Sequence, residues 1–227
     1  MILFLAAYMK KGYGVSVVVD SLCKEYSKLG TKCVVACLES DGFFREIDVV
    51  KTTPDPSRIK EIASRFECKV IVAHTTPFFE VLPGLSGQYS VWCWEHGDPN
   101  PEFFTQDRLE RKQIIERKRH SIYENVTGVI AISDFIRREI DCPEAKVIHN
   151  GCDHIESRPM SYNRNTQLVR VGTLVRLGAG EAVYKGRPLL VQLYKNLLSR
   201  ELPIELHVMG RGSEQDRKIF ESMGVKV

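Results

Sequence analysis

The sequence predicts an α/β fold built on parallel β-sheet. Short apolar runs, each long enough for one strand, alternate with segments of helical spacing. Such alternation is typical of a parallel sheet covered by helices. Two of the runs end in polar loops that begin with histidine, and the whole pattern is interrupted once, over residues 157–167, before it resumes.

The part before the interruption contains seven predicted strands and five predicted helices. The first helix is expected to stop at Gly30, and the second has Pro56 near its start, where proline is tolerated. The strands are expected at Ile2–Tyr8, Thr31–Leu38, Asp48–Lys51, Lys69–His74, Tyr89–Glu95, Gly128–Ser133 and Lys146–His149. The helices are expected at Val15–Leu29, Ser57–Arg65, Phe78–Leu85, Thr105–Asn125 and Asp134–Ile140.

The polar segment 157–167 is interpreted as a linker between two domains, because its composition shifts to polar residues with proline and asparagine. The first domain is then residues 1–156, and a second begins at 168. Its predicted elements are strands at Leu168–Thr173 and Ile204–Met209, helices at Pro188–Arg200 and Ser213–Met223, and a strand starting at Val225. Three strands make a small sheet, so this second domain is expected to be incomplete.

Composition excludes several classes of protein. A formal net charge of +3 over 227 residues is too small for a nucleic-acid-binding protein. No apolar run reaches the roughly 18–20 residues of a membrane span, and the lysines follow the first apolar run instead of preceding it, unlike a signal peptide. The seven cysteines are odd in number and lack a C-x-x-C pair, which favours free thiols in the cytoplasm and no metal site.

The turn after the first strand, Lys10-Lys11-Gly12-Tyr13-Gly14, is a candidate anion-binding loop. Glycines such as Gly12 and Gly14 allow a ligand to approach the backbone, and the helix that follows offers free N–H groups. Val17 occupies the third position of the dinucleotide fingerprint G-x-G-x-x-G, so a NAD-dependent oxidoreductase is disfavoured. A tight turn without a ligand is the alternative interpretation.

His74 and His96 each follow a predicted strand. Ligands of open parallel sheets bind at the carboxyl ends of the strands, and His96 lies in the polar sequence Glu95-His96-Gly97-Asp98 directly after a buried strand. We therefore predict a functional role for His96. For His74 a structural role is the default, and Trp92 and Trp94 are expected to pack in the core.

In the second part, Arg176 follows a strand and Lys185 precedes a helix nine positions later. An arginine and a lysine at the mouth of a strand–loop–helix unit suit a diphosphate, because arginine offers a planar fork and lysine a point charge. They would also stabilise a departing nucleoside diphosphate. A Walker signature is absent, which excludes a P-loop nucleotide hydrolase.

The predicted helix at 105–125 is rich in charge, with basic residues in excess. A solvated surface is the default interpretation. The positive excess also fits peripheral contact with an anionic membrane surface at the inner face.

Together these landmarks resemble the retaining glycosyltransferases of family four, which have the GT-B architecture of two Rossmann-like domains. The resemblance runs over nearly the whole chain, in the same order. It rests on Gly12-Tyr13-Gly14, His96, Val129-Ile130-Ala131-Ile132-Ser133, Val147-Ile148-His149-Asn150-Gly151-Cys152-Asp153, Val171 to Arg176 with Lys185-Gly186, and Val208-Met209-Gly210-Arg211-Gly212.

The resemblance implies a role for each landmark. Gly12 and Gly14 would face the donor diphosphate, and His96 would contact the donor sugar. Arg176 and Lys185 would bind the donor phosphates, although residues 178–184 are extra in that loop. Gly210 and Gly212 would lie by the nucleotide. Asn150, Gly151 and Asp153 would form the hinge.

The implied reaction moves a sugar, with retention, from a nucleoside diphosphate sugar to a glycan, lipid or small-molecule acceptor, without metal or other cofactor. The donor would bind mainly to the second domain and the acceptor to the first. The family's two-glutamate motif would lie beyond Val227, so residues 1–227 alone are expected to be inactive. Two alternatives remain: a non-catalytic truncated transferase that acts as a binding module, and a nucleotide-sugar epimerase of similar fold.

Overall fold

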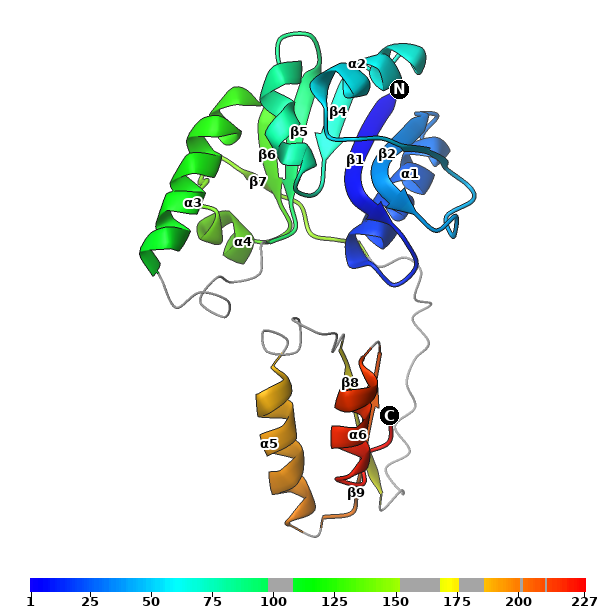
Figure 1. The fold of residues 1–227 in the computed structure, drawn as a ribbon, viewed down its shortest axis with the longest axis vertical. Helices are drawn as coiled ribbons and strands as arrows, with labels where there is room; N and C mark the ends of the chain where they lie inside the picture. Colours follow the sequence, from blue (N-terminus) through cyan, green and yellow to red (C-terminus); the bar gives the residue numbers. More distant parts are fainter. Residues whose placement is uncertain (98–107, 152–167, 176–185, 201, 211) are drawn as a thin grey trace. The chain divides into compact units, whose positions relative to one another are not determined.

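The computed structural model describes residues 1–97, 108–151, 168–175, 186–200, 202–210 and 212–227. Within these ranges the chain divides into two compact units (Figure 1). The first contains the described residues up to Gly151, and the second contains those from Leu168 onward. The predicted linker, 157–167, lies outside the described residues.

The first unit is built on a seven-stranded sheet in which every neighbouring pair of strands is parallel. The order β3-β2-β1-β4-β5-β6-β7 is that of a doubly wound Rossmann-like sheet. The strands are β1 (Ile2–Met9), β2 (Cys33–Ser40), β3 (Asp48–Lys51), β4 (Val70–Ala73), β5 (Ser90–Glu95), β6 (Gly128–Ala131) and β7 (Lys146–Val147).

Buried side chains cover both faces of this sheet. On one face, which we call the α1 face, Val19 and Cys23 of α1 (Gly14–Lys28) pack against Phe4, Val35 and Trp94 of the strands. The opposite face, which we call the α2 face, is covered by apolar side chains of three further helical segments. These are α2 (Pro56–Arg65), the 3₁₀ segment η1 (Phe78–Leu85) and η3 (Tyr123–Asn125). The remaining helices are α3 (Arg108–Ser121) and α4 (Asp134–Glu139).

Local sequence explains where these segments begin and end. Gly30 adopts a φ of +77° just after α1, a conformation that favours glycine and ends the helix as predicted. Asp55 caps α2 by accepting hydrogen bonds from the N–H groups of Ser57 and Arg58. The segment expected as a short helix at 78–85 is a 3₁₀ helix that contains Pro83, which lacks the N–H group an α-helix needs.

The second unit contains the parallel pair β8 (Val169–Leu174) and β9 (Ile204–Met209). A parallel bridge between His207 and Lys226 adds the chain end to the other side of β9, where the sequence predicts a starting strand. The core gathers Tyr194 of α5 (Arg187–Leu198), Phe220 of α6 (Glu214–Glu221), Leu206 and Val208. The predicted α/β fold with parallel sheet is therefore confirmed, and no helix in the described ranges is long and apolar enough to cross a bilayer.

Candidate functional site

The order of the first sheet places a switch point between β1 and β4, because the chain crosses from β1 to β2 on one side and reaches β4 on the other. Ligands of such sheets bind at the carboxyl ends of the strands beside this point. The backbone N–H of Ala7 in β1 donates to Oγ1 of Thr75, just after β4, at 2.7 Å. The loop after β4 therefore contacts the carboxyl-terminal part of β1 at this edge.

The predicted glycine loop lies at the same edge, between β1 and α1. Gly12 has a φ of +81°, and a side chain built at Gly12 or Gly14 would meet no atom within 4 Å. The buried Ser16 hydroxyl fixes the loop, because it donates to the Tyr8 carbonyl at 2.8 Å and accepts from the Lys10 N–H at 3.2 Å. No side chain caps α1, so its first N–H groups remain available to an anion.

A second loop supports the glycine loop from the side. The carboxylate of Asp41 accepts hydrogen bonds from the backbone N–H groups of Lys11, at 2.9 Å, and of Phe43, at 3.0 Å. These two bonds lower the pKa of Asp41, since they favour its ionised form. The sequence does not reveal this contact, because Asp41 is 30 positions away from Lys11.

His74 and His96 come together at the carboxyl ends of the neighbouring strands β4 and β5. Nδ1 of His74 lies 2.9 Å from Nε2 of His96, a hydrogen-bonding distance. The His74 ring is buried between Phe4 and Trp94, with its centroid 5.5 Å and 5.2 Å from theirs, whereas His96 is half-buried. His96 and His74, for which a structural role was the default, are therefore direct partners, and the predicted role of His96 stays a prediction.

Both imidazoles are held neutral at pH 7. Burial lowers the pKa of His96 to about 4. The pKa of His74 is lowered well below its ordinary value by burial first and by the neighbouring His96 second. Burial has this effect because a charged imidazolium loses its hydration. The pair can thus donate or accept hydrogen bonds at neutral pH, but it is not a cationic clamp.

Two ring nitrogens, one within this histidine pair and one on the adjacent Trp94, are buried without a hydrogen-bond partner. In the described part of the chain, Nε2 of His74 and Nε1 of Trp94 are the buried side-chain nitrogen or oxygen atoms that lack a hydrogen-bond partner. Such atoms are rare in folded proteins and require an explanation. Trp94 packs in the core as predicted, but with its N–H group unpaired.

The opposite face of β5 carries a buried ion pair that the sequence did not single out. The Glu95 carboxylate accepts hydrogen bonds from Nζ of Lys118 and from the Tyr123 hydroxyl, each at 2.6 Å. The Glu95 side chain is 2% exposed and that of Lys118 12% exposed. The Lys118 ammonium also lies 4.8 Å from the centre of the Phe79 ring. This network joins α3 to the sheet at the strand that positions His96.

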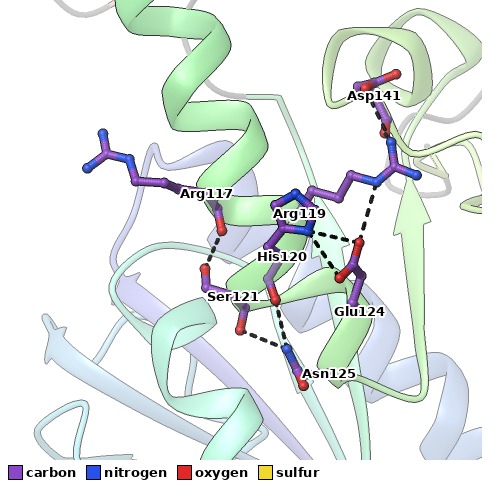
Figure 2. A network of polar contacts seen from close by, with 7 residues as sticks. All are labelled: Arg117, Arg119, His120, Ser121, Glu124, Asn125 and Asp141. Atoms are coloured by element: carbon purple, nitrogen blue, oxygen red, sulfur yellow. Dashed lines mark hydrogen bonds and ion pairs between the residues drawn. The ribbon is translucent and has the colours of Figure 1, made fainter.

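Figure 2 shows a second polar network, at the end of α3. Arg119 pairs with Asp141 at 3.3 Å and with Glu124 at 3.8 Å, while Nδ1 of His120 lies 3.1 Å from the Glu124 carboxylate. Nδ2 of Asn125 donates to the His120 carbonyl at 2.8 Å and so satisfies a terminal acceptor of the helix. Part of the basic excess of α3 is therefore bound to acidic residues of the same unit.

In the second unit, Gly210 and Gly212 line a hollow of about 270 Å³ at the carboxyl end of β9. Gly210 has a φ of +131°, and a side chain there would come within 2.2 Å of the Val175 carbonyl oxygen, so this position requires glycine. Ser213 and Asp216 form a capping box at the start of α6. Arg187 of α5 pairs with Asp216 at 2.5 Å. Burial opposes ionisation of Asp216, but the bonds from Ser213 and Arg187 leave its pKa lowered.

The other predicted residues fall into two groups. Asn150 and Gly151 are exposed and follow β7. Asp153, Arg176 and Lys185 lie outside the described residues, so the predicted phosphate clamp stays a prediction.

No curated protein sequence matches the chain. Solved structures that resemble it include a glycosyltransferase from Rickettsia africae ESF-5, at 12% identity and a TM-score of 0.61, over 99% of this chain and 65% of that one. S. aureus MnaA, solved with UDP, matches at 12% identity and a TM-score of 0.57, over 98% of this chain and 66% of that one. A structure assigned to a UDP-N-acetylglucosamine 2-epimerase of Listeria monocytogenes matches at 13% identity and a TM-score of 0.54, over 97% of this chain and 65% of that one.

The chain thus spans about two thirds of the length of these structures. At such low identity the likeness shows the fold, and the GT-B class that the sequence predicts is confirmed. The sequence itself matches the family model described as Glycosyltransferase Family 4 over residues 13–155, more than half of the chain. That range holds Gly14, both histidines and the buried Glu95 network. The chain belongs to glycosyltransferase family 4.

Proposed function

We propose that the chain takes part in the transfer of a sugar, with retention of configuration, from a nucleoside diphosphate sugar to a glycan, lipid or small-molecule acceptor. The observation that supports this most is the neutral pair His74–His96 at the carboxyl ends of β4 and β5, next to the switch point, within the range that matches the family. A neutral imidazole can hydrogen-bond a sugar hydroxyl without attracting unrelated anions.

The remaining residues supply the phosphate and nucleotide contacts in this proposal. Gly12, Gly14 and the uncapped start of α1 present backbone N–H groups to the diphosphate. Arg176 and Lys185, as the family resemblance implies, bind the donor phosphates and stabilise the diphosphate as it leaves. Gly210 and Gly212 lie against the nucleotide, in the hollow after β9. The MnaA structure was solved with UDP, which supports a nucleotide as part of the ligand.

Calorimetry of residues 1–227 with UDP-glucose and GDP-mannose as probes tests donor binding. Product analysis with and without sugar acceptors is made on the complete protein, since residues 1–227 alone are expected to be inactive. Transfer to an acceptor supports the proposal. In the complete protein, replacing Lys185 by alanine should lower turnover at least tenfold, equivalent to about 1.4 kcal/mol of transition-state stabilisation. Lys195→Ala, an exposed lysine of α5, is the matched control and should leave turnover unchanged. Full activity of Lys185→Ala would contradict the clamp.

The epimerase alternative has one observation in its favour, the likeness to the Listeria structure. An epimerase changes the sugar of the donor when no acceptor is present, so product analysis with donor alone separates the two activities. Binding of nucleotide sugar without any product would instead support the binding module. Transfer that is undiminished by EDTA is expected, because the proposed reaction needs no metal ion.

We propose in addition a cytoplasmic location with peripheral contact between α3 and an anionic membrane. Six cysteines in the described ranges are free thiols, which suits a reducing compartment. Arg119 is paired with Glu124 and Asp141, however, and Lys118 with Glu95, so exposed residues such as Lys112 and Arg117 would make the contact. Sedimentation with vesicles of phosphatidylserine, compared with vesicles of phosphatidylcholine, tests this.

A further inference from the structure

The hydrogen bond between His74 and His96 can form in either of two directions. Either His74 donates from Nδ1 to Nε2 of His96, or His96 donates from Nε2 to Nδ1 of His74. Because both rings are neutral at pH 7, each ring carries one proton, and the direction of the bond fixes the position of that proton on both rings. The two arrangements therefore leave opposite hydrogen-bonding groups on the remaining nitrogens.

The buried side of the pair distinguishes these arrangements. If His96 donates, the second nitrogen of His74, Nε2, must carry the proton, and this atom is buried without a partner. That would add a second unpaired N–H to the one already present on Trp94, whose ring stacks on His74. If His74 donates, Nε2 is a bare lone pair. Buried orphan N–H groups are the rarer of the two cases in proteins, which favours His74 as the donor.

His96 is the half-buried member of the pair, and its second ring nitrogen is Nδ1. Nε2 of His96 is hydrogen-bonded to Nδ1 of His74. Nδ1 of His96 is not among the buried unpartnered atoms of the described residues. With His74 as donor, His96 carries its proton on Nδ1. The group that the site offers to a ligand is then an N–H donor.

We propose that His74 is a positioning residue that holds His96 in its Nδ1–H tautomer, so that His96 offers a hydrogen-bond donor to an oxygen of the bound sugar. The ligand in this statement rests on the proposed function, whereas the tautomer does not. This tautomer matters for specificity. An N–H donor at this position binds a ligand that places an oxygen there, and the N–H group stays unpaired when the ligand lacks that oxygen.

The direct test is nitrogen NMR of the full chain labelled with ¹⁵N-histidine, at pH 7 and without ligand. Long-range proton–nitrogen correlations distinguish an Nδ1–H from an Nε2–H imidazole. The six histidines are assigned by single substitutions. The expected result is Nδ1–H for both His74 and His96. An Nε2–H signal for His96 in the wild type would overturn the proposal, whether or not any variant folds.

Two substitutions at position 74 then separate positioning from packing. In His74→Asn the side-chain amide nitrogen lies where Nδ1 was and can donate in the same direction, so His96 should stay Nδ1–H. In His74→Leu the donor is lost and no group enforces the Nδ1–H form, so the His96 signals should shift toward those of a mixture of the two tautomers. His120→Leu is the matched control, because it removes an exposed histidine of the same unit, and it should leave the His96 signals unchanged.

Calorimetry connects the tautomer to the ligand. With whichever probe binds the wild type, UDP-glucose or GDP-mannose, His74→Leu should weaken affinity about fivefold. It should leave affinity for free UDP or GDP unchanged, and His74→Asn should restore affinity for the sugar nucleotide. An equal loss for nucleotide and sugar nucleotide would contradict the positioning role. Failure of the wild type to bind either probe would count against the proposed function, while the NMR result would still decide the tautomer.

Discussion

Two neighbouring residues of β5 show how differently the two faces of the first sheet treat buried polar groups. Glu95 points to the α2 face, where Lys118 and Tyr123 both bind its carboxylate. Trp94 points to the α1 face, where its N–H group and Nε2 of the adjacent His74 are buried without partners. At Glu95 the α2 face carries a charge and compensates it, whereas at Trp94 the α1 face carries neutral rings with unpaired nitrogens.

This difference suggests a division of roles. A paired buried charge contributes little net stability but is costly to disrupt, so it holds elements in register. Unpaired neutral nitrogens cost stability in the folded state, and such costs concentrate at functional sites. The α2 face therefore anchors β5 and α3, while the α1 face carries the unpaired nitrogens beside the candidate site.

The largest effect is expected from Lys118→Met. It leaves the Glu95 carboxylate buried and lacking its cationic partner, which should lower the free energy of unfolding by about 3–5 kcal/mol. Urea unfolding followed by circular dichroism measures this. Lys112→Met is the control, because Lys112 lies 3.9 Å from Glu116 with a side chain 74% exposed, and it should cost under about 1 kcal/mol. Similar losses in both variants would remove the distinction between the paired charge and a surface pair.

The next effect concerns pH and the α1 face. His96 has a folded pKa of about 4, below the 6.5 of an unfolded histidine. Between these values the unfolded chain binds a proton that the folded chain does not, so stability falls as pH falls from about 6.5 to about 4. The loss from His96 is on the order of 3 kcal/mol, and His74 shifts in the same direction.

Urea unfolding at several pH values, for the wild type and for His96→Asn, isolates this contribution from that of the carboxylates. The variant should show a shallower decline in stability over the same range. Identical declines would mean that the histidine pair is not held neutral by the fold.

A smaller loss is expected from Tyr123→Phe, which removes the hydroxyl donor to Glu95 and retains the ring. A hydrogen bond to a charged group contributes about 1.5–3 kcal/mol, and the remaining Lys118 places the expected loss toward the lower end. Thermal unfolding of the variant provides the measurement. A loss as large as that of Lys118→Met would show that the hydroxyl, not the ammonium, compensates the charge.

The smallest effect is expected from Trp94→Phe, within about 1 kcal/mol of the wild type. The substitution loses apolar contact but also removes a buried donor that had no partner, and the two effects offset one another. Trp92→Phe is the matched comparison, because Nε1 of Trp92 donates to Ser90 at 3.1 Å. It should cost more than Trp94→Phe in the same urea titration, and the reverse order would contradict the contrast between a paired and an unpaired indole N–H group.

The sequence was sufficient to predict the class of fold, because the residues within and next to each strand or helix determine where that element forms. Alternation of apolar runs and helical spacing predicts the elements, and Gly30 marks the end of α1 through its backbone conformation. Periodicity does not distinguish an α-helix from a 3₁₀ helix over a segment as short as 78–85, where Pro83 decides the outcome.

The candidate site was predicted less fully, because it depends on contacts between distant segments. His96 could be singled out as a polar residue after a buried strand. Its partner depends on the pairing of β4 with β5, in which Ala73 lies opposite Cys93, and one sequence does not reveal that register. The same holds for Glu95, whose partners Lys118 and Tyr123 follow 23 and 28 positions later on segments packed over the opposite face.

The place of the tryptophans has an optical consequence. The chain has two, Trp92 and Trp94, both on β5 of the first unit and both on the α1 face. Intrinsic fluorescence excited at the indole band therefore reports this strand alone and is silent about the second unit. The His74 ring stacks on Trp94 with centroids 5.2 Å apart, and imidazolium quenches an adjacent indole. Emission can thus follow protonation of the histidine pair and loosening of β5 without any added label.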